Sequence, residues 1–583
     1  MFFEGKGSSL ETFIRDYLAS LKEREELDAI LPDLLSELGF TVYSRPGRGT
    51  TQHGVDVAAV GAGDDGENKV YLFSIKQGDL TRKDWDGGSL QDLRPSLNEI
   101  QDAYIPSRIP KEYEHLRIVI CLCFGGDMQE QVRPAVTGYI EQHTTERISF
   151  EQWNGDKLAG LILLGILREE ILPKSLRSSF QKAVAMVDEP DVAFIHFSTL
   201  VRQLRNSAVE SAKARVTSAR QIYVCLWILF VWARDVGNVE APYRASEVAL
   251  LSVWDLARSI IGKKTNEARD VTAVLHQLIA LHLIISDELT GKMLPYIEKR
   301  DALSTAVNSR SSTDVNLKLF DLLGRIAMRG LWFHWMASQS EGEETNEMRR
   351  RVTEWASNGF RLIQANRILF TPLCDQQAIE IALFLLLAAA SNGDDRSIPN
   401  WLTEMVHLLD VTFRTHGKYP CVFVDYRDIV EHPRDRSDEY FREATSGSIL
   451  IPLLAAWLSA LGETEAVEKL ATLVRSTLAH CTLQLWLPDS TTEEKLYVGG
   501  QHHGLALSDL PFSNPGDDLL GTIAEACERE NSFSKLSPSV EGYWPIILLA
   551  CRHYRLPVPP HYWIELLRPA SPAPEAASTS IEL

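Results

Sequence analysis

Two side chains that could act on a phosphodiester, Asp56 and Lys76, stand at the ends of neighbouring predicted strands. A divalent cation can activate water and neutralise the charge that develops on a phosphate. Magnesium keeps several of its own waters, so one or two carboxylates and a backbone carbonyl suffice to hold it. Asp56 and the carbonyl of Ile75 could supply such ligands, while Lys76 could orient the attacking water. Ser74 shares a strand face with Lys76, at the position where such a site needs a carboxylate or an amide.

The elements that must position these residues alternate between helix and strand up to about residue 172. Apolar residues at helical spacing predict a helix over 28–38, and Gly39 ends it. A glycine- and aspartate-rich stretch, GAGDDGEN, predicts a turn between two strands. The predicted strands are 40–43, 55–60, 70–75, 117–124 and 148–152, and further helices are predicted over 88–104, 128–142 and 154–167. This order predicts an α/β domain in which a mixed sheet is flanked by helices.

Other charged residues surround the same elements. Glu25 and Asp28 lie three apart, on one helical face, and could direct an acid to the site. Trp85 could be a base-stacking platform, but we favour a core position. Basic residues that could contact phosphates, or that are only scattered surface charge, are Arg45, Arg48, Arg82, Lys83 and Arg94.

At this point the chain resembles the PD-(D/E)XK, restriction-endonuclease-like superfamily, and most closely its Mrr-like and archaeal-resolvase-like branches. The matching segments are LGF at Leu38–Phe40, GRGTTQHGVD at Gly47–Asp56 and SIK at Ser74–Lys76. The family pattern is an acid on the first helix, a glycine-plus-aromatic helix end, a glycine loop before an aspartate, and then E-x-K or Q-x-K. The resemblance spans roughly residues 15–172. It extends to FEQWNGDKLAGLI at Phe150–Ile162, which is similar to the closing strand and helix of prokaryotic defence nucleases.

The resemblance implies a catalytic set of Asp56, Lys76, the Ser74 position and a first-helix acid. That acid maps best onto Asp28, with Glu25 as the second choice. It also implies Mg²⁺ (or Mn²⁺) bound by Asp56, the Ile75 carbonyl and Asp28.

The departure from the family is Ser74, and three accounts of it stay open. The metal could be held by Asp56, the Ile75 carbonyl, the first-helix acid and water, with Ser74 binding through a water. A neighbouring group, such as Gln77 or an acid of the Asp64–Glu67 turn, could substitute. Finally, the fold could have lost catalysis and only bind nucleic acid.

Composition limits the remaining possibilities. A length of 583 residues predicts about two to four domains. The formal net charge of -20 means that any nucleic-acid contact must come from local patches. Eight cysteines without a CxxC pair predict neither a zinc module nor a disulfide framework.

No secretory signal is expected, and the longest apolar runs, 222–233 and 381–390, are shorter than the roughly 20 residues of a membrane span. We therefore expect a cytoplasmic protein that does not enter a membrane. No P-loop and no G-x-S-x-G elbow is present.

The rest of the chain has a different sequence pattern, which is almost entirely helical. Residues 173–568 predict a large all-α domain, an irregular solenoid- or bundle-like helical array that could form two subdomains, after a nuclease-like domain at 1–172. One of its predicted helices covers 463–485. Adjacent His502 and His503 favour loop polarity over metal binding. Residues 569–583 are rich in proline and alanine and predict a disordered tail.

Two functions follow. The first is a magnesium-dependent endonuclease, with DNA favoured over RNA. Its helical region would sense a partner protein, a nucleic-acid end or a ligand, in prokaryotic antiviral defence. A homodimer would suit double-strand cleavage. The alternative is a catalytically inactive, nuclease-like nucleic-acid-binding scaffold that assembles with partner subunits.

Overall fold

A computed structural model gives the fold of this chain. It describes residues 18, 27–45, 53–63, 65–89, 91–165, 174–208, 211–303, 311–391, 397–500, 503–512 and 517–568. The chain divides into two compact units. The first comprises Met1–Ala249 with Lys263–Ile285, and the second Leu250–Gly262 with Ser286–Leu583.

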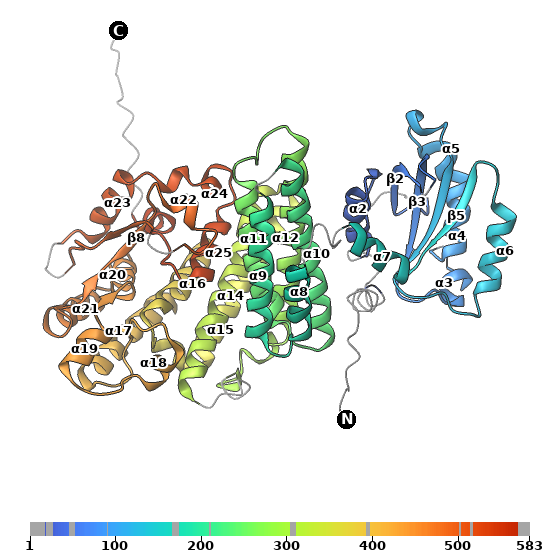
Figure 1. Cartoon of the computed structure of the whole chain (residues 1–583). Coiled ribbons are helices and arrows are strands. Elements are labelled where there is room, and N and C mark those ends of the chain that lie inside the picture. Colours follow the sequence, from blue (N-terminus) through green and yellow to red (C-terminus); the bar gives the residue numbers. More distant parts are fainter. Residues whose placement is uncertain are drawn as a thin grey trace, which may run out of the picture. The chain divides into compact units, whose positions relative to one another are not determined.

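The first unit begins with a five-stranded mixed sheet in the order β1-β2-β3-β4-β5 (Figure 1). Strand β2 is antiparallel to both β1 and β3, whereas β4 is parallel to both β3 and β5. The strands are β1 (Thr41–Ser44), β2 (Val57–Ala62), β3 (Asn68–Lys76), β4 (Ile118–Phe124) and β5 (Ile148–Trp153). The predicted mixed sheet with flanking helices is thus confirmed.

Helices cover both faces of this sheet. Figure 1 shows α2 (Asp28–Glu37) and α7 (Gly155–Gly165) on one side, and α3 (Arg82–Asp86), α4 (Leu93–Glu99) and α6 (Arg133–His143) on the other. Successive side chains of β3 point to opposite faces of the sheet, so the strand contributes to the core on both sides. Leu72 packs in a core with residues of α3, α4 and α6, including Trp85, as expected for that tryptophan. Phe73 meets Trp153, with ring centroids 4.8 Å apart.

Two predicted helices of this domain differ in detail. The helix predicted over 88–104 begins only at Leu93, and its second part is the π-helix η2 (Ile100–Tyr104). The helix predicted over 128–142 begins at Arg133, because Met128 forms a β-bridge with Leu80. At the second of these places a contact with a distant segment decides where the helix begins.

The remaining described part of the first unit is helical. It contains α8 (Lys174–Ala185), α9 (Pro190–Ser207), α10 (Ala212–Asp235) and parts of α11 (Glu240–Ala257) and α12 (Asn266–Gly291). By length and composition, Ala212–Asp235 and Asn266–Tyr296 could cross a membrane. However, 94% and 56% of their apolar windows are buried inside the structure, and the core helix of a globular domain has the same composition.

The second unit is largely helical as well. Its longer helices are α14 (Ser312–Gln339), α15 (Glu343–Ala365), α16 (Ala378–Ala390), α17 (Ser397–Thr415), α20 (Leu450–Ala460), α21 (Thr464–Ser476), α23 (Leu519–Arg529) and α25 (Pro545–Tyr554). It also holds two short strand pairs, β6 (Gly447–Ser448) with β7 (Thr482–Leu483), and β8 (Leu485–Leu487) with β9 (Leu505–Leu507). The prediction of one helix over 463–485 is wrong beyond Ser476, because the Thr482 amide donates to the Ser446 carbonyl.

A buried carboxylate begins α20. The first amides of a helix have no partner within it. Here Asp375 accepts hydrogen bonds from the Ile449 amide at 2.7 Å, the Leu450 amide at 3.3 Å and the Ser448 hydroxyl at 2.5 Å. Burial raises the pKa of Asp375 to about 6, although these three hydrogen bonds oppose the shift. The native state therefore binds this proton more tightly than the unfolded chain does.

We predict that Asp375 makes the second unit less stable as the pH rises. Its stabilising contribution is complete below pH 3.8, its ordinary pKa, and is lost as the pH passes through about 6. This difference in pKa between the folded and unfolded states corresponds to roughly 3 kcal/mol of unfolding free energy. Asp375→Asn should remove this component, so calorimetric unfolding midpoints of variant and wild type should diverge between pH 4 and 7. Parallel pH profiles would contradict the prediction.

Candidate active site

Asp56 extends the pairing between β2 and β3 with its own side chain. The last paired residues of the two strands are Val57 and Phe73. One step further, the Asp56 amide donates to the Phe73 carbonyl at 2.8 Å. The Asp56 Oδ2 atom then accepts the Ile75 amide at 2.8 Å. The carboxylate thus takes the place of a backbone carbonyl at the end of the ladder.

The glycine before Asp56 is required by its surroundings. Gly54 has a left-handed φ of +77°. A Cβ added there would lie 2.2 Å from the carbonyl oxygen of Ser96 in α4. Only glycine permits both conditions. The backbone at Gly54 is therefore in close contact with α4. This contact fixes the direction from which the chain reaches Asp56 and β3.

Ser74 and Lys76 lie inside the domain. They pair in register with Leu122 and Phe124 of β4, and their exposed fractions are 1% and 8%. Lysine is almost never buried to this extent unless its charge is compensated. Alternation places both side chains on the face of β3 that carries Leu72. That face is covered by α3 and α4.

The negative charge of Asp56 affects a residue of β4, Cys123. Burial raises the pKa of the Cys123 thiol, and the nearby Asp56 carboxylate raises it further. Cys123 pairs with Ile75, whose amide Asp56 accepts. The amide and the carbonyl of one residue in a strand point to the same side. The Ile75 carbonyl therefore faces the same edge as the Asp56 carboxylate, as a shared cation would require.

The loops that follow β3, β4 and β5 are hydrogen-bonded to one another. The Gly126 amide donates to the Gly78 carbonyl at 2.9 Å, and the Asp127 amide to Asp79 Oδ1 at 2.9 Å. The Gly155 amide donates to the Gly126 carbonyl at 3.0 Å. These contacts hold the carboxyl ends of the three parallel strands together.

Asp79 and Asp127 are not among the residues that the sequence analysis singles out for the site. A signal was present: QGD follows β3 and GGD follows β4, so each of two adjacent strands ends in a glycine and an aspartate. The carboxyl ends of parallel strands are the usual place for ligands.

The predicted auxiliary residues come from several elements. Asp28 is the first residue of α2, and its charge contributes to the raised pKa of Tyr223, for which burial is the main cause. Arg45 lies 3.7 Å from Asp33 of α2. Arg82 and Lys83 are exposed on α3, which covers the face of the sheet opposite to α2. The described basic residues of this set thus come from two segments, the end of β1 and α3. Glu25, Arg48 and the loop 46–52 lie outside the described residues.

Few protein groups near Asp56 could act as ligands of a cation. Among the residues that the structure describes, no three His, Cys, Asp or Glu side chains are grouped closely enough to hold a metal ion. What the strands bring together is the Asp56 carboxylate, the Ile75 carbonyl and the Ser74 hydroxyl. Two protein oxygens are compatible with magnesium, which keeps most of its shell as water.

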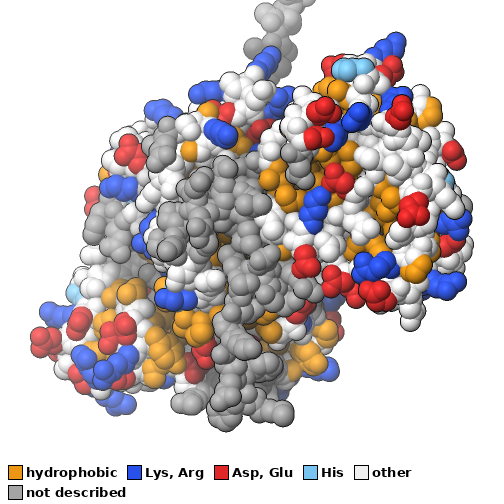
Figure 2. Space-filling model, turned by 45° about the vertical axis from the view of Figure 1, so that its right-hand side comes forward, with side chains coloured by type: hydrophobic (Ala, Val, Ile, Leu, Met, Phe, Trp, Pro, Cys, Tyr) orange, Lys and Arg blue, Asp and Glu red, His pale blue; other side chains and the backbone are white. Residues whose placement is uncertain are grey.

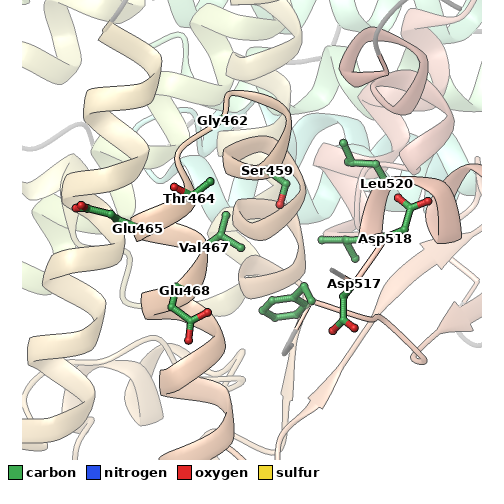
Figure 3. Close-up of a pocket in the computed structure, with 11 residues that line it drawn as sticks. Ser459, Gly462, Thr464, Glu465, Val467, Glu468, Asp517, Asp518 and Leu520 are labelled. Carbon is green, nitrogen blue, oxygen red and sulfur yellow. The ribbon is translucent and has the colours of Figure 1, made fainter. Parts of the chain in front are cut away.

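The second unit contains a separate cavity of about 790 Å³ (Figure 3). Carboxylates dominate its polar lining. Glu465 and Glu468 come from α21, and Asp517 and Asp518 precede α23. Asp518 caps α23 by accepting the Gly521 amide at 2.9 Å, and Glu468 accepts from Arg475 at 2.7 Å. A hollow of this charge repels phosphate groups.

The surface seen in Figure 2 carries lysine and arginine interspersed with aspartate and glutamate. No single-sign field dominates that view. This agrees with the net charge of -20 and leaves phosphate recognition to local groups.

Comparison of the chain with protein-family models, with curated proteins and with solved structures finds no match.

We predict that the contact between Asp56 and the Ile75 amide stabilises the sheet independently of any chemistry. Asp56→Ala leaves a half-buried amide without its acceptor, which should cost about 1–3 kcal/mol. Asp56→Asn keeps a carbonyl oxygen in place and should cost less. Hydrogen exchange of the peptide containing Ile75 is the measurement. Equal protection in the wild type and in Asp56→Ala would contradict the assignment.

Proposed function

We propose that the sheet domain of the first unit is a metal-dependent nuclease that hydrolyses phosphodiesters in DNA. One observation carries the proposal. The Asp56 carboxylate lies 2.8 Å from the Ile75 amide, and the next residue is the buried Lys76. An acid and a base are thereby held at adjoining positions of one strand pair, as the resemblance to the PD-(D/E)XK superfamily requires.

Each group has a defined role in this proposal. Asp56 and the Ile75 carbonyl would hold Mg²⁺ or Mn²⁺, which when bound supplies an activated water and neutralises charge. Lys76 stabilises negative charge on the phosphate or orients the water. Its burial strengthens that effect, because the electrostatic interaction of a lysine is weaker in bulk water. Asp28, or Glu25, is the further acid that the resemblance implies.

Substrate contacts in this proposal are local. Arg82 and Lys83 are exposed on α3 and are available to phosphates of the backbone. Arg45 already lies beside Asp33, so its contribution is smaller. A role for the helical region in sensing a partner protein, a nucleic-acid end or a ligand, in cytoplasmic antiviral defence, rests on analogy with the family alone. Dimerisation for double-strand cleavage has the same basis.

A second candidate is a nuclease-like scaffold that binds nucleic acid without cleaving it. The observation that favours it is Ser74. This residue stands where the family carries a carboxylate or an amide, and it is 1% exposed. A neutral hydroxyl is a poor magnesium ligand, because magnesium sites rely on carboxylate and phosphate oxygens.

Cleavage of plasmid DNA by the full-length protein tests the nuclease. With Mg²⁺ or Mn²⁺ we expect nicked and linear products. Asp56→Asn and Lys76→Ala should each lower the rate at least about 100-fold, since each removes charge that stabilises the transition state. Lys111→Ala, which removes an exposed lysine of the same domain, should leave the rate unchanged. A parallel assay with RNA of matched length decides between the two nucleic acids.

Binding measurements distinguish the scaffold from the nuclease. Retained DNA binding with no cleavage under either metal would support the scaffold. Ser74→Glu then provides a further arm, because a site that lacks only this ligand should gain Mn²⁺ affinity in calorimetry. Ser74→Ala is its matched control and should gain none. Cleavage that survives in Asp56→Asn would refute the assignment of the site.

A further inference from the structure

Two cysteines of the second unit lie directly opposite each other. Cys374 and Cys421 form a parallel β-bridge. The Cys421 amide donates to the Leu373 carbonyl at 3.0 Å, and the Asp375 amide donates to the Cys421 carbonyl at 2.9 Å. Bridged strands run about 5 Å apart, with paired side chains on the same face. This separation falls within the Cα distances that disulfides span.

The two thiols also interact with each other. The interaction with Cys374 is the main reason that the pKa of Cys421 is lowered. The same contact, together with burial, raises the pKa of Cys374. The Cys421 thiol has its own acceptor, the Leu373 carbonyl, at 3.4 Å. The lowered pKa makes Cys421 the member of the pair that loses its proton first, although its own hydrogen bond to the Leu373 carbonyl favours the protonated form.

Cys421 differs in this respect from the other cysteines. All eight lie in the described part of the chain, and all have free thiols. The pKa of each of the other seven is raised, with burial among its causes. The reactive form of cysteine is the thiolate. The neighbour that could resolve an oxidised Cys421 is already in contact with it.

We propose that Cys374 and Cys421 are an oxidisable dithiol, which a hydroperoxide converts into an intramolecular disulfide. The Cys421 thiolate attacks one peroxide oxygen, the O–O bond breaks, and a sulfenic acid and hydroxide form. Cys374 then attacks the Cys421 sulfur, the S–O bond breaks, and water leaves as the S–S bond forms. In total, two thiols and one hydrogen peroxide give one disulfide and two waters.

Burial selects the oxidant. The exposed fractions of Cys374 and Cys421 are 5% and 1%. Leu373, Ile429 and Phe423 surround them with apolar groups. Hydrogen peroxide is small and uncharged, so it can reach the pair during small openings of the native state. A bulky aromatic disulfide reagent cannot.

The disulfide would link two segments that hold helices of the second unit in place. Cys374 immediately precedes Asp375, which caps α20, and Cys421 lies between α17 and α18 (Tyr426–Glu431). A cross-link between them restricts the unfolded chain and stabilises the native one. Oxidation would therefore make the second unit more rigid.

The test uses the reduced, full-length protein treated with hydrogen peroxide and then alkylated. Peptide mass spectrometry should find Cys374 joined to Cys421 with the loss of two hydrogens. This product should appear at least about tenfold faster than oxidation of any other cysteine. The unfolding midpoint should rise by several degrees and return after reduction with dithiothreitol. Earlier oxidation of other cysteines, or a sulfinic acid at Cys421 in place of the cross-link, would overturn the proposal.

Three variants sharpen the result. Cys374→Ser removes the resolving thiol, so a sulfenic acid at Cys421 should accumulate and be trapped by a cyclic diketone. Cys421→Ser should give neither product. Cys481→Ser is the matched control and should still form the cross-link, because the pKa of Cys481 is raised by burial. Should the first two variants fail to fold, the wild-type mass spectrum decides alone. None of these outcomes depends on nuclease activity.

Discussion

Strand β3 is hydrogen-bonded along both edges, and this double pairing determines where Ser74, Ile75 and Lys76 lie. It pairs antiparallel with β2 up to Phe73 and parallel with β4 up to Lys76. A strand held on both sides cannot slip by one residue without turning its buried face outward. Ser74, Ile75 and Lys76 are consequently presented in a fixed order at the carboxyl end of the strand. A site built on such a strand is organised before any ligand arrives.

Asp56 serves both structure and candidate chemistry, and the two uses share one hydrogen bond. By accepting the Ile75 amide, its carboxylate completes the β2–β3 ladder. The same contact places its charge beside the Ile75 carbonyl and near Cys123. Ser74 does not add a second charge. In our proposal Asp56 is one carboxylate ligand of the cation, and Ser74 stands where the PD-(D/E)XK superfamily, which the sequence resembles, has a second.

The second unit concentrates its unusual chemistry in one short segment. Asp375 caps α20 from a buried position, and Cys374 beside it faces Cys421 across a β-bridge. Both features arise from the same backbone pairing, in which Cys421 bonds to Leu373 and Asp375. A buried carboxylate and a buried dithiol each cost stability, and each is compensated by hydrogen bonds that only this arrangement supplies. The segment thus couples packing to pH and, in our proposal, to oxidation.

Sequence alone determined the type and order of most elements, because helical and strand periodicities are local properties of the chain. It located a mixed sheet before a helical region, and it put Lys76 at the end of one strand and Asp56 on the neighbouring one, which in the structure begins one residue later, at Val57. Only the tertiary structure decided the contacts between distant segments. Pairing of Thr482 with Ser446 ended a predicted helix at Ser476, and Arg45 came to lie 3.7 Å from Asp33 of α2. The approach of Cys421 to Cys374 belongs to the same class. Hydrogen bonds and ion pairs of this kind depend on where the chain returns in space, and no local pattern encodes that.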